Sequence, residues 1–137
     1  MGICFEVPGE PRGKGRPRFS KQGHTYTDSE TKAYEQKIIA YYRKAYGAFR
    51  YPDNEFISVK VIAYYPIPKR ATKADMAAMQ VGKLLPSRKP DIDNVLKVVL
   101  DALNGVAYKD DSRVVQVEAE KKYSFDPRLE IHIEGSD

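Results

Sequence analysis

The sequence has few of the residues that form covalent or soft-metal cross-links. Its 137 residues include one cysteine, Cys4, two histidines and no tryptophan. A single cysteine excludes an internal disulfide framework and a thiolate metal site. Apolar residues alternate around it at Ile3, Phe5 and Val7, so the sequence predicts a short strand in which Cys4 simply packs.

Long apolar runs are missing as well. No stretch is long and apolar enough to cross a membrane, and the N-terminus lacks the basic-then-apolar pattern of a signal peptide. A hydrophobic content of 42% and a charged content of 31% are ordinary for a soluble globular protein. We therefore expect a single cytoplasmic domain, residues 1–137, with no membrane partner.

Basic residues gather in two segments, and the first covers residues 9–21. The net charge of +4 is mild, so the positions of the cations are more informative than their number. Glycines and prolines prevent a helix here, and a glycine-rich basic loop can bring N–H and guanidinium groups to phosphates. A mobile surface loop is the alternative, whereas the order of a nucleotide-binding P-loop is absent. The candidate phosphate contacts are Arg12, Lys14, Arg16 and Arg18.

The second basic segment, residues 69–89, is predicted to contain a short helix around Ala71–Gln80 that Thr72 caps. The segment leads directly into Asp91. A basic segment beside an acidic site suits an enzyme with a polyanionic substrate, although a solvated loop accounts for each cation singly. The candidate DNA contacts here are Lys69, Arg70, Lys73, Arg88 and Lys89.

Residues 91–103 have the pattern of a mostly buried helix. At about 100° per residue, apolar side chains cover one broad side. Residues 104–105, Asn-Gly, provide a stop because both types tolerate the left-handed conformation that ends many helices. The narrow polar seam of this helix holds Asp93, Asn94, Lys97 and Asp101.

Each acidic residue has an ordinary explanation by itself. Asp91 is suited to capping the helix with its carboxylate. Asp93 and Lys97 are spaced for a surface ion pair worth about 0.2–0.5 kcal/mol, and Asp101 is a second partner for Lys97. Taken together, and with an Asp-Asp pair beyond the helix, these carboxylates repel one another unless a cation lies among them. Mg²⁺ prefers such oxygen ligands, and the predicted metal ligands are Asp91, Asp93, Asp111 and Asp110.

The run KPDIDNVLKVVLDALNGVAYKDDSRVV, residues 89–115, resembles the signature of the RusA family of Holliday junction resolvases. That signature has Asp-x-Asp-Asn at a helix start, a lysine four residues after the second Asp, and Asp-Asp past the helix. The matching residues are Asp91, Asp93, Asn94, Lys97, Asp110 and Asp111. The resemblance implies that Asp91, Asp93, Lys97 and Asp111 are catalytic. It also implies a homodimer that makes paired, symmetric nicks in four-way DNA junctions with Mg²⁺ or Mn²⁺, in recombination and repair in bacteria and their prophages.

The acidic and basic residues suit phosphodiester hydrolysis, which needs an activated water and neutralisation of the charge that develops on the phosphate. One or two Mg²⁺ ions held by carboxylates supply both. Lys97, one turn beyond Asp93, would stabilise phosphate charge or orient the water. A two-fold symmetric junction is also best matched by a two-fold symmetric protein.

The order of elements predicts an α+β domain, a mixed sheet with two main helices packed on it. The final strand carries His132, which we expect to be an ordinary exposed residue. The other expected elements are strand 3–7, a hairpin at 18–27, a helix from a Thr27–Glu30 capping box to Gly47, strand 56–65, the central helix, strand 112–123 and strand 129–133.

Four functions are compatible with these patterns. The first is a Mg²⁺-dependent endonuclease for four-way junctions, and the second is a nuclease for another branch, such as a flap or a fork. The third is a DNA-binding module without catalysis. The fourth is an interaction protein whose acidic seam holds a structural cation or salt bridges. Metal-dependent cleavage that disappears in Asp93→Asn would exclude the two non-catalytic functions.

Overall fold

A four-stranded mixed sheet is the base of the structure, a computed structural model that describes residues 1–15, 18–26 and 28–136. The strands lie in the order β1-β6-β4-β5, with β4 parallel to β5 and the other neighbours antiparallel. Their bounds are β1 (Gly2–Pro8), β4 (Ile57–Pro66), β5 (Val114–Ser124) and β6 (Arg128–Gly135). The predicted mixed sheet is confirmed.

Alternation along the strands makes one face of the sheet apolar. In β1 the side chains of Ile3, Phe5 and Val7 are buried, while Cys4 between them is exposed. Because successive side chains of a strand point to opposite faces, Cys4 lies on the other, open face. The prediction that Cys4 simply packs is therefore wrong.

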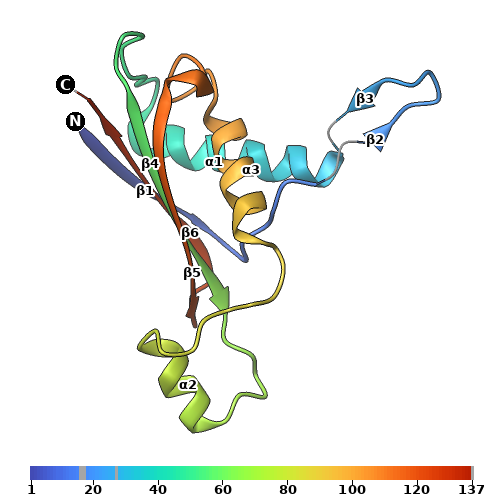
Figure 1. Cartoon of the computed structure of the whole chain (residues 1–137), viewed down its shortest axis with the longest axis vertical. Coiled ribbons are helices and arrows are strands. Elements are labelled where there is room, and N and C mark those ends of the chain that lie inside the picture. The colour runs from blue at the N-terminus through green and yellow to red at the C-terminus, as the bar shows by residue number, and fades with distance from the viewer. Residues whose placement is uncertain (16–17, 27, 137) are drawn as a thin grey trace.

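Helices α1 (Ser29–Tyr46) and α3 (Ile92–Leu103) pack on the apolar face and against each other, as Figure 1 shows. The predicted α+β fold with two main helices is confirmed. In the part of the chain that the structure describes, none of the helices has the length and apolar character needed to cross a bilayer.

The N-cap of helix α1 lies one residue later than predicted. Asp28 is the N-cap, and its carboxylate accepts a hydrogen bond from the Thr31 N–H at 2.8 Å. This carboxylate satisfies a backbone donor of the first turn, so the predicted capping by Thr27 is wrong, and Thr27 itself lies outside the described residues. The helix ends before Gly47, as predicted, with φ of 61° at that glycine.

Two buried tyrosines fix the two ends of α3. The Tyr65 hydroxyl, from β4, donates to the carbonyl oxygen of Pro90 just before the helix. The Tyr108 hydroxyl, from the loop after the helix, donates to the Leu100 carbonyl oxygen at 2.8 Å. Both rings belong to the core, and a buried tyrosine with a bonded hydroxyl holds its partner in place.

Two smaller elements project away from the sheet and its helices (Figure 1). One is the hairpin of β2 (Arg18–Phe19) and β3 (Thr25–Tyr26), and the other is α2 (Lys73–Gln80). Thr72 caps α2 as predicted, because its hydroxyl accepts from the Asp75 N–H at 3.1 Å.

Candidate functional site

The start of α3 leaves the carboxylate of Asp91 available to a ligand. Asp91 is the N-cap residue, and its backbone carbonyl accepts from the N–H groups of Asn94 and Val95 at 3.1 Å each. Its side chain makes no capping hydrogen bond, so the predicted capping by the carboxylate is wrong. Asp93 and Lys97 follow on the same helix with exposed side chains, and no ion pair joins them.

The first basic segment is docked against this helix start. The Lys14 N–H donates to the Asn94 carbonyl oxygen at 2.9 Å. A Cβ atom at Gly13 would lie 2.9 Å from the Cβ atoms of both Asn94 and Pro90. Glycine is therefore required for the loop to approach α3 this closely, and the loop is held in position rather than merely tethered.

A second contact joins the same loop to the start of α1. The Gly15 N–H donates to the Thr31 hydroxyl oxygen at 3.0 Å, and a Cβ atom at Gly15 would lie 2.2 Å from a carboxylate oxygen of Asp28. The loop thus bridges the N-terminal ends of α1 and α3. Arg16, a predicted phosphate contact, lies outside the described residues.

A cavity of about 520 Å³ lies between this loop and the two helix starts. Its walls are residues 11–15, the first turns of α1 and the segment 89–91 with Asn94. Of the predicted site residues, it brings together Arg12, Lys14, Lys89 and Asp91. The cavity therefore combines cations, backbone N–H groups and one side of the acidic signature.

Lys14 is held inside the chain by two carboxylates. Its ammonium lies 2.9 Å from Glu35 of α1 and 3.1 Å from Asp101 of α3. Burial alone would lower the pKa of Lys14, but the hydrogen bonds with these carboxylates outweigh burial and raise it. Asp101 thus pairs with Lys14, and its predicted pairing with Lys97 is wrong.

Asp110 and Asp111 lie at the opposite end of α3, beside Tyr108. Burial raises the pKa of the Tyr108 phenol, and the negative charges of Asp111, Asp101 and Asp110 add to that shift. Asp110 caps the short 3₁₀ helix η1 (Asp111–Arg113), because its carboxylate accepts from the Ser112 N–H at 3.4 Å. The Ser112 side chain first, and then the backbone N–H groups of Ser112 and Asp111, lower the pKa of Asp110 by hydrogen bonding to its carboxylate.

The two halves of the acidic signature are therefore separated within one chain. The 12 residues of α3 span about 18 Å at roughly 1.5 Å per residue, with Asp91 and Asp93 at one end and Asp111 near the other. Among the residues that the structure describes, no three Asp or Glu carboxylates converge closely enough to bind one cation. The predicted convergence of Asp111 with Asp91 and Asp93 does not occur inside a single chain.

The second basic segment passes along the same end of α3. The Arg88 guanidinium lies 5.7 Å from the centre of the Tyr65 ring and 3.8 Å from a Glu10 carboxylate oxygen. Lys89 lines the cavity beside Asp91. The remaining predicted DNA contacts of this segment are exposed around α2: Lys69, Arg70 and Lys73.

Tyr34 is a site residue that the sequence did not reveal. Its side chain is only 5% exposed and lines the cavity. Burial raises its pKa to about 12, against the opposing effect of the nearby Arg12 backbone and guanidinium. The hydroxyl has no partner of hydrogen-bonding geometry among the described residues. A tyrosine on a helix is usually part of the core, so nothing in its spacing sets it apart.

The chain is similar to known proteins over nearly its whole length. The profile of a family described as Endodeoxyribonuclease RusA matches residues 8–134, a range that contains both basic segments and both acidic pairs. A curated protein of Bacillus subtilis (strain 168), "Uncharacterized protein YqaN", is 37% identical to this chain over an alignment 138 residues long. The alignment covers 96% of this chain and 94% of that protein.

Proposed function

The chain belongs to the RusA family of endodeoxyribonucleases, and on this premise we propose that it resolves four-way DNA junctions by paired, symmetric, Mg²⁺-dependent nicks. The observation that carries the proposal is the exposed Asp91–Asp93 pair beside a cavity walled by a docked, glycine-rich basic loop. At this end of α3, basic side chains would contact the phosphates of a DNA strand, and the adjacent carboxylates would bind a catalytic metal ion.

The side chains fit a hard divalent cation, either Mg²⁺ or Mn²⁺. Asp91 is not engaged in capping, and Asp93 is exposed, so both carboxylates can ligate. Mg²⁺ is commonly held by one or two carboxylates with waters completing its shell. When bound, the cation would activate a water and neutralise charge on the phosphate. Lys97, exposed one turn further along α3, would hold a phosphate oxygen of the scissile group.

A homodimer would complete the acidic site. We infer that two copies pair across α3 in antiparallel orientation, because a two-fold interface then places the start of one α3 beside the end of its partner. Asp91 and Asp93 of one subunit would meet Asp110 and Asp111 of the other. In this arrangement each subunit contributes half of both sites.

The described surface offers an apolar strip for such pairing. β5 is an edge strand, and its Val117, paired with the buried Val59, points to the helix-covered side of the sheet yet is 43% exposed. Val115, two residues earlier on the same strand, is 62% exposed. Leu96 and Leu100 of α3 are only partly buried in the same region. An exposed apolar patch of this kind marks an interaction surface.

The test uses a labelled four-way junction, a replication fork and a linear duplex of the same arms, each with Mg²⁺ and with EDTA. We expect paired nicks in the junction alone, lost with EDTA. In Asp93→Asn the cleavage rate should fall more than about 100-fold, a loss of about 2.7 kcal/mol of transition-state stabilisation. The matched control is Glu120→Gln, which removes an exposed carboxylate from the open face of β5.

Each other outcome identifies a different function. Tight junction binding without cleavage in Mg²⁺ would leave a DNA-binding module. Preferential cleavage of the fork would make the protein a nuclease for another branch. Full cleavage by Asp93→Asn would place catalysis elsewhere in the chain.

A further inference from the structure

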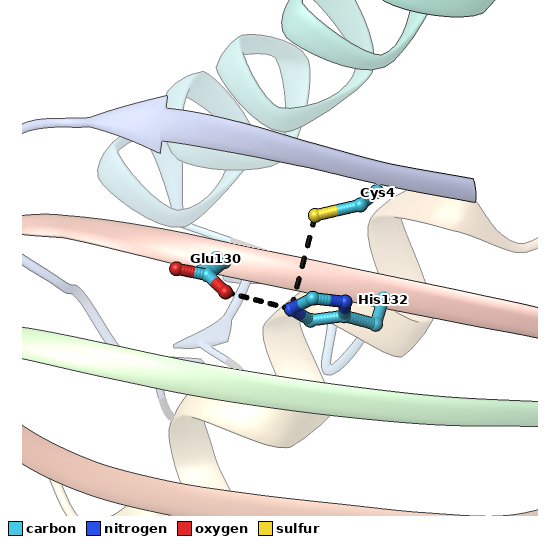
Figure 2. A group of neighbouring side chains, drawn as sticks. All are labelled: Cys4, Glu130 and His132. Carbon is cyan, nitrogen blue, oxygen red and sulfur yellow. Dashed lines mark hydrogen bonds and ion pairs between the residues drawn. The ribbon is translucent and has the colours of Figure 1, made fainter. Parts of the chain in front are cut away.

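The open face of the sheet, opposite to the face that α3 covers, carries a cluster of three metal-ligand side chains. β1 and β6 are antiparallel, and Cys4 lies directly opposite His132 in their register. Glu130 is two residues before His132 on β6 and so points to the same face. Figure 2 shows the three side chains turned toward one another above the strands.

The ligand atoms are close to the spacing that a tetrahedral cation imposes. The Cys4 Sγ lies 3.8 Å from the His132 Nε2, and that nitrogen lies 2.7 Å from a Glu130 oxygen. All three ligand atoms lie within 4.8 Å of one another. Ordinary zinc bond lengths place S and N about 3.6 Å apart, and N and O about 3.3 Å apart, on a tetrahedron. Ligation would therefore shorten the S–N separation by about 0.2 Å and lengthen the N–O separation by about 0.6 Å.

The arrangement differs from that of a catalytic thiol. In a nucleophile–base–carboxylate triad, the imidazole uses one nitrogen for the nucleophile and the other for the carboxylate. Here Cys4 and Glu130 both face Nε2 of His132. Burial, then Glu130 and Glu6, also raise the pKa of the Cys4 thiol, which is the opposite of activation. Convergence of three donors on one point is the geometry of cation ligands.

We propose that Cys4, Glu130 and His132 bind one borderline-soft divalent cation, Zn²⁺ foremost, with a water as the fourth ligand. Binding would displace the thiol proton and open the hydrogen bond between Glu130 and His132. A cavity of about 450 Å³ next to Cys4 and His132 leaves space for the water. The expectation that a single cysteine excludes a thiolate metal site does not cover this mixed set, in which one thiolate is joined by a histidine and a carboxylate.

The backbone around Cys4 is already fixed in the position that ligation needs. β1 is an edge strand, and the Tyr46 hydroxyl accepts from the Cys4 N–H and donates to the Cys4 carbonyl oxygen, both at 2.9 Å. The cation would therefore fasten β1 to β6 through side chains, on the face opposite to the proposed nuclease site. Its role would be to stabilise the sheet, independently of cleavage.

The test is a Co²⁺ titration of reduced, tag-free protein, followed by absorption spectroscopy. We expect one equivalent to produce a thiolate-to-cobalt charge-transfer band in the near ultraviolet, together with the intense visible bands of four-coordinate Co²⁺. One equivalent of Zn²⁺ should abolish both, and excess Mg²⁺ should not. Asp93→Asn should behave as the wild type, because its carboxylate belongs to α3.

The matched variants are Cys4→Ser and His132→Gln, checked for folding by circular dichroism. Both side chains are substantially exposed, so both variants should fold. We expect the charge-transfer band to vanish in Cys4→Ser. We also expect Zn²⁺ to raise the melting temperature of the wild type, and this rise to be absent in both variants. A wild type without the band, or an unchanged band in Cys4→Ser, would overturn the proposal.

Discussion

Two tyrosines near the start of α3 differ in one hydroxyl contact, and this difference predicts different effects on stability when each hydroxyl is removed. The Tyr65 hydroxyl donates to Pro90, whereas the Tyr34 hydroxyl is buried without a hydrogen-bond partner in the described residues. An unsatisfied buried polar group costs about 1–3 kcal/mol, and a satisfied one contributes about 1 kcal/mol.

We predict opposite effects for two matched substitutions. Tyr34→Phe should raise the free energy of unfolding by about 1 kcal/mol, and Tyr65→Phe should lower it by about 1 kcal/mol. Denaturant titration at neutral pH measures both. Destabilisation by Tyr34→Phe would show that the hydroxyl has a partner in solution.

The same phenol predicts a loss of stability at alkaline pH. The pKa of Tyr34 is raised from 10.0 to about 12 in the folded chain, so its proton is held more tightly there than in the unfolded chain. The free energy of unfolding is therefore unaffected by this phenol below about pH 10, where it is protonated in both states. It falls as the pH rises from 10 toward 12, because the unfolded chain loses the proton first. In Tyr34→Phe the fall in stability over this window should be shallower.

Helices and strands were predictable from sequence to the extent that their signals are local. The periodicity of α3, the glycine after α1 and the Thr72 cap all depend on neighbours a few residues apart, and the structure confirms them. Contacts between distant elements carry no such signal. The pairing of Lys14 with Asp101, and of Cys4 with His132, depends on how the elements pack.

The docked basic loop allows structural and DNA-binding cations to be separated. Lys14→Met would leave Glu35 and Asp101 without their shared cation, and we predict a loss of about 1–3 kcal/mol in the free energy of unfolding. Arg12→Gln should leave stability unchanged, because Arg12 is exposed. It should instead weaken junction binding and reduce the salt dependence of log K by about one unit.

These two variants need both measurements, unfolding and fluorescence-detected junction binding over a range of salt. If Lys14→Met were as stable as the wild type, the ion pairs of Lys14 would not contribute to the free energy of unfolding. An unchanged salt dependence of log K in Arg12→Gln would show that Arg12 does not contact DNA phosphates.

At the scale of the whole molecule, the sequence signature did not reveal that its two acidic halves are separated. The spacing along the chain suggests a single site, but the rigid length of α3 intervenes. The proposed dimer resolves this and assigns the exposed apolar strip to the interface.

The interface predicts that Val117→Glu is a folded monomer. A charge in the strip would be buried without a partner on association, so the mass measured by light scattering should fall to that of one chain and junction cleavage should be lost. Val81→Glu is the control, because Val81 is equally apolar and 69% exposed on the α2 segment. A monomeric wild type would contradict the proposed dimer.

Mixed dimers distinguish shared sites from separate ones. A dimer of one Asp93→Asn subunit and one Asp111→Asn subunit should retain one intact shared site and nick one strand of the junction. A dimer of wild type with the double variant should be inactive, because each shared site then lacks one carboxylate. Sites confined to single chains would give the reverse pattern.

The length of helix α3 would also set the distance between the two proposed active sites. Tyr65 and Tyr108 hold its two ends, and in an antiparallel pair the two shared sites lie one helix length apart. The span between the two scissile phosphates would then be about 18 Å, and one added helical turn would widen it by about 5.4 Å. The separation of the two cuts in a junction would thus follow from the length of a single helix.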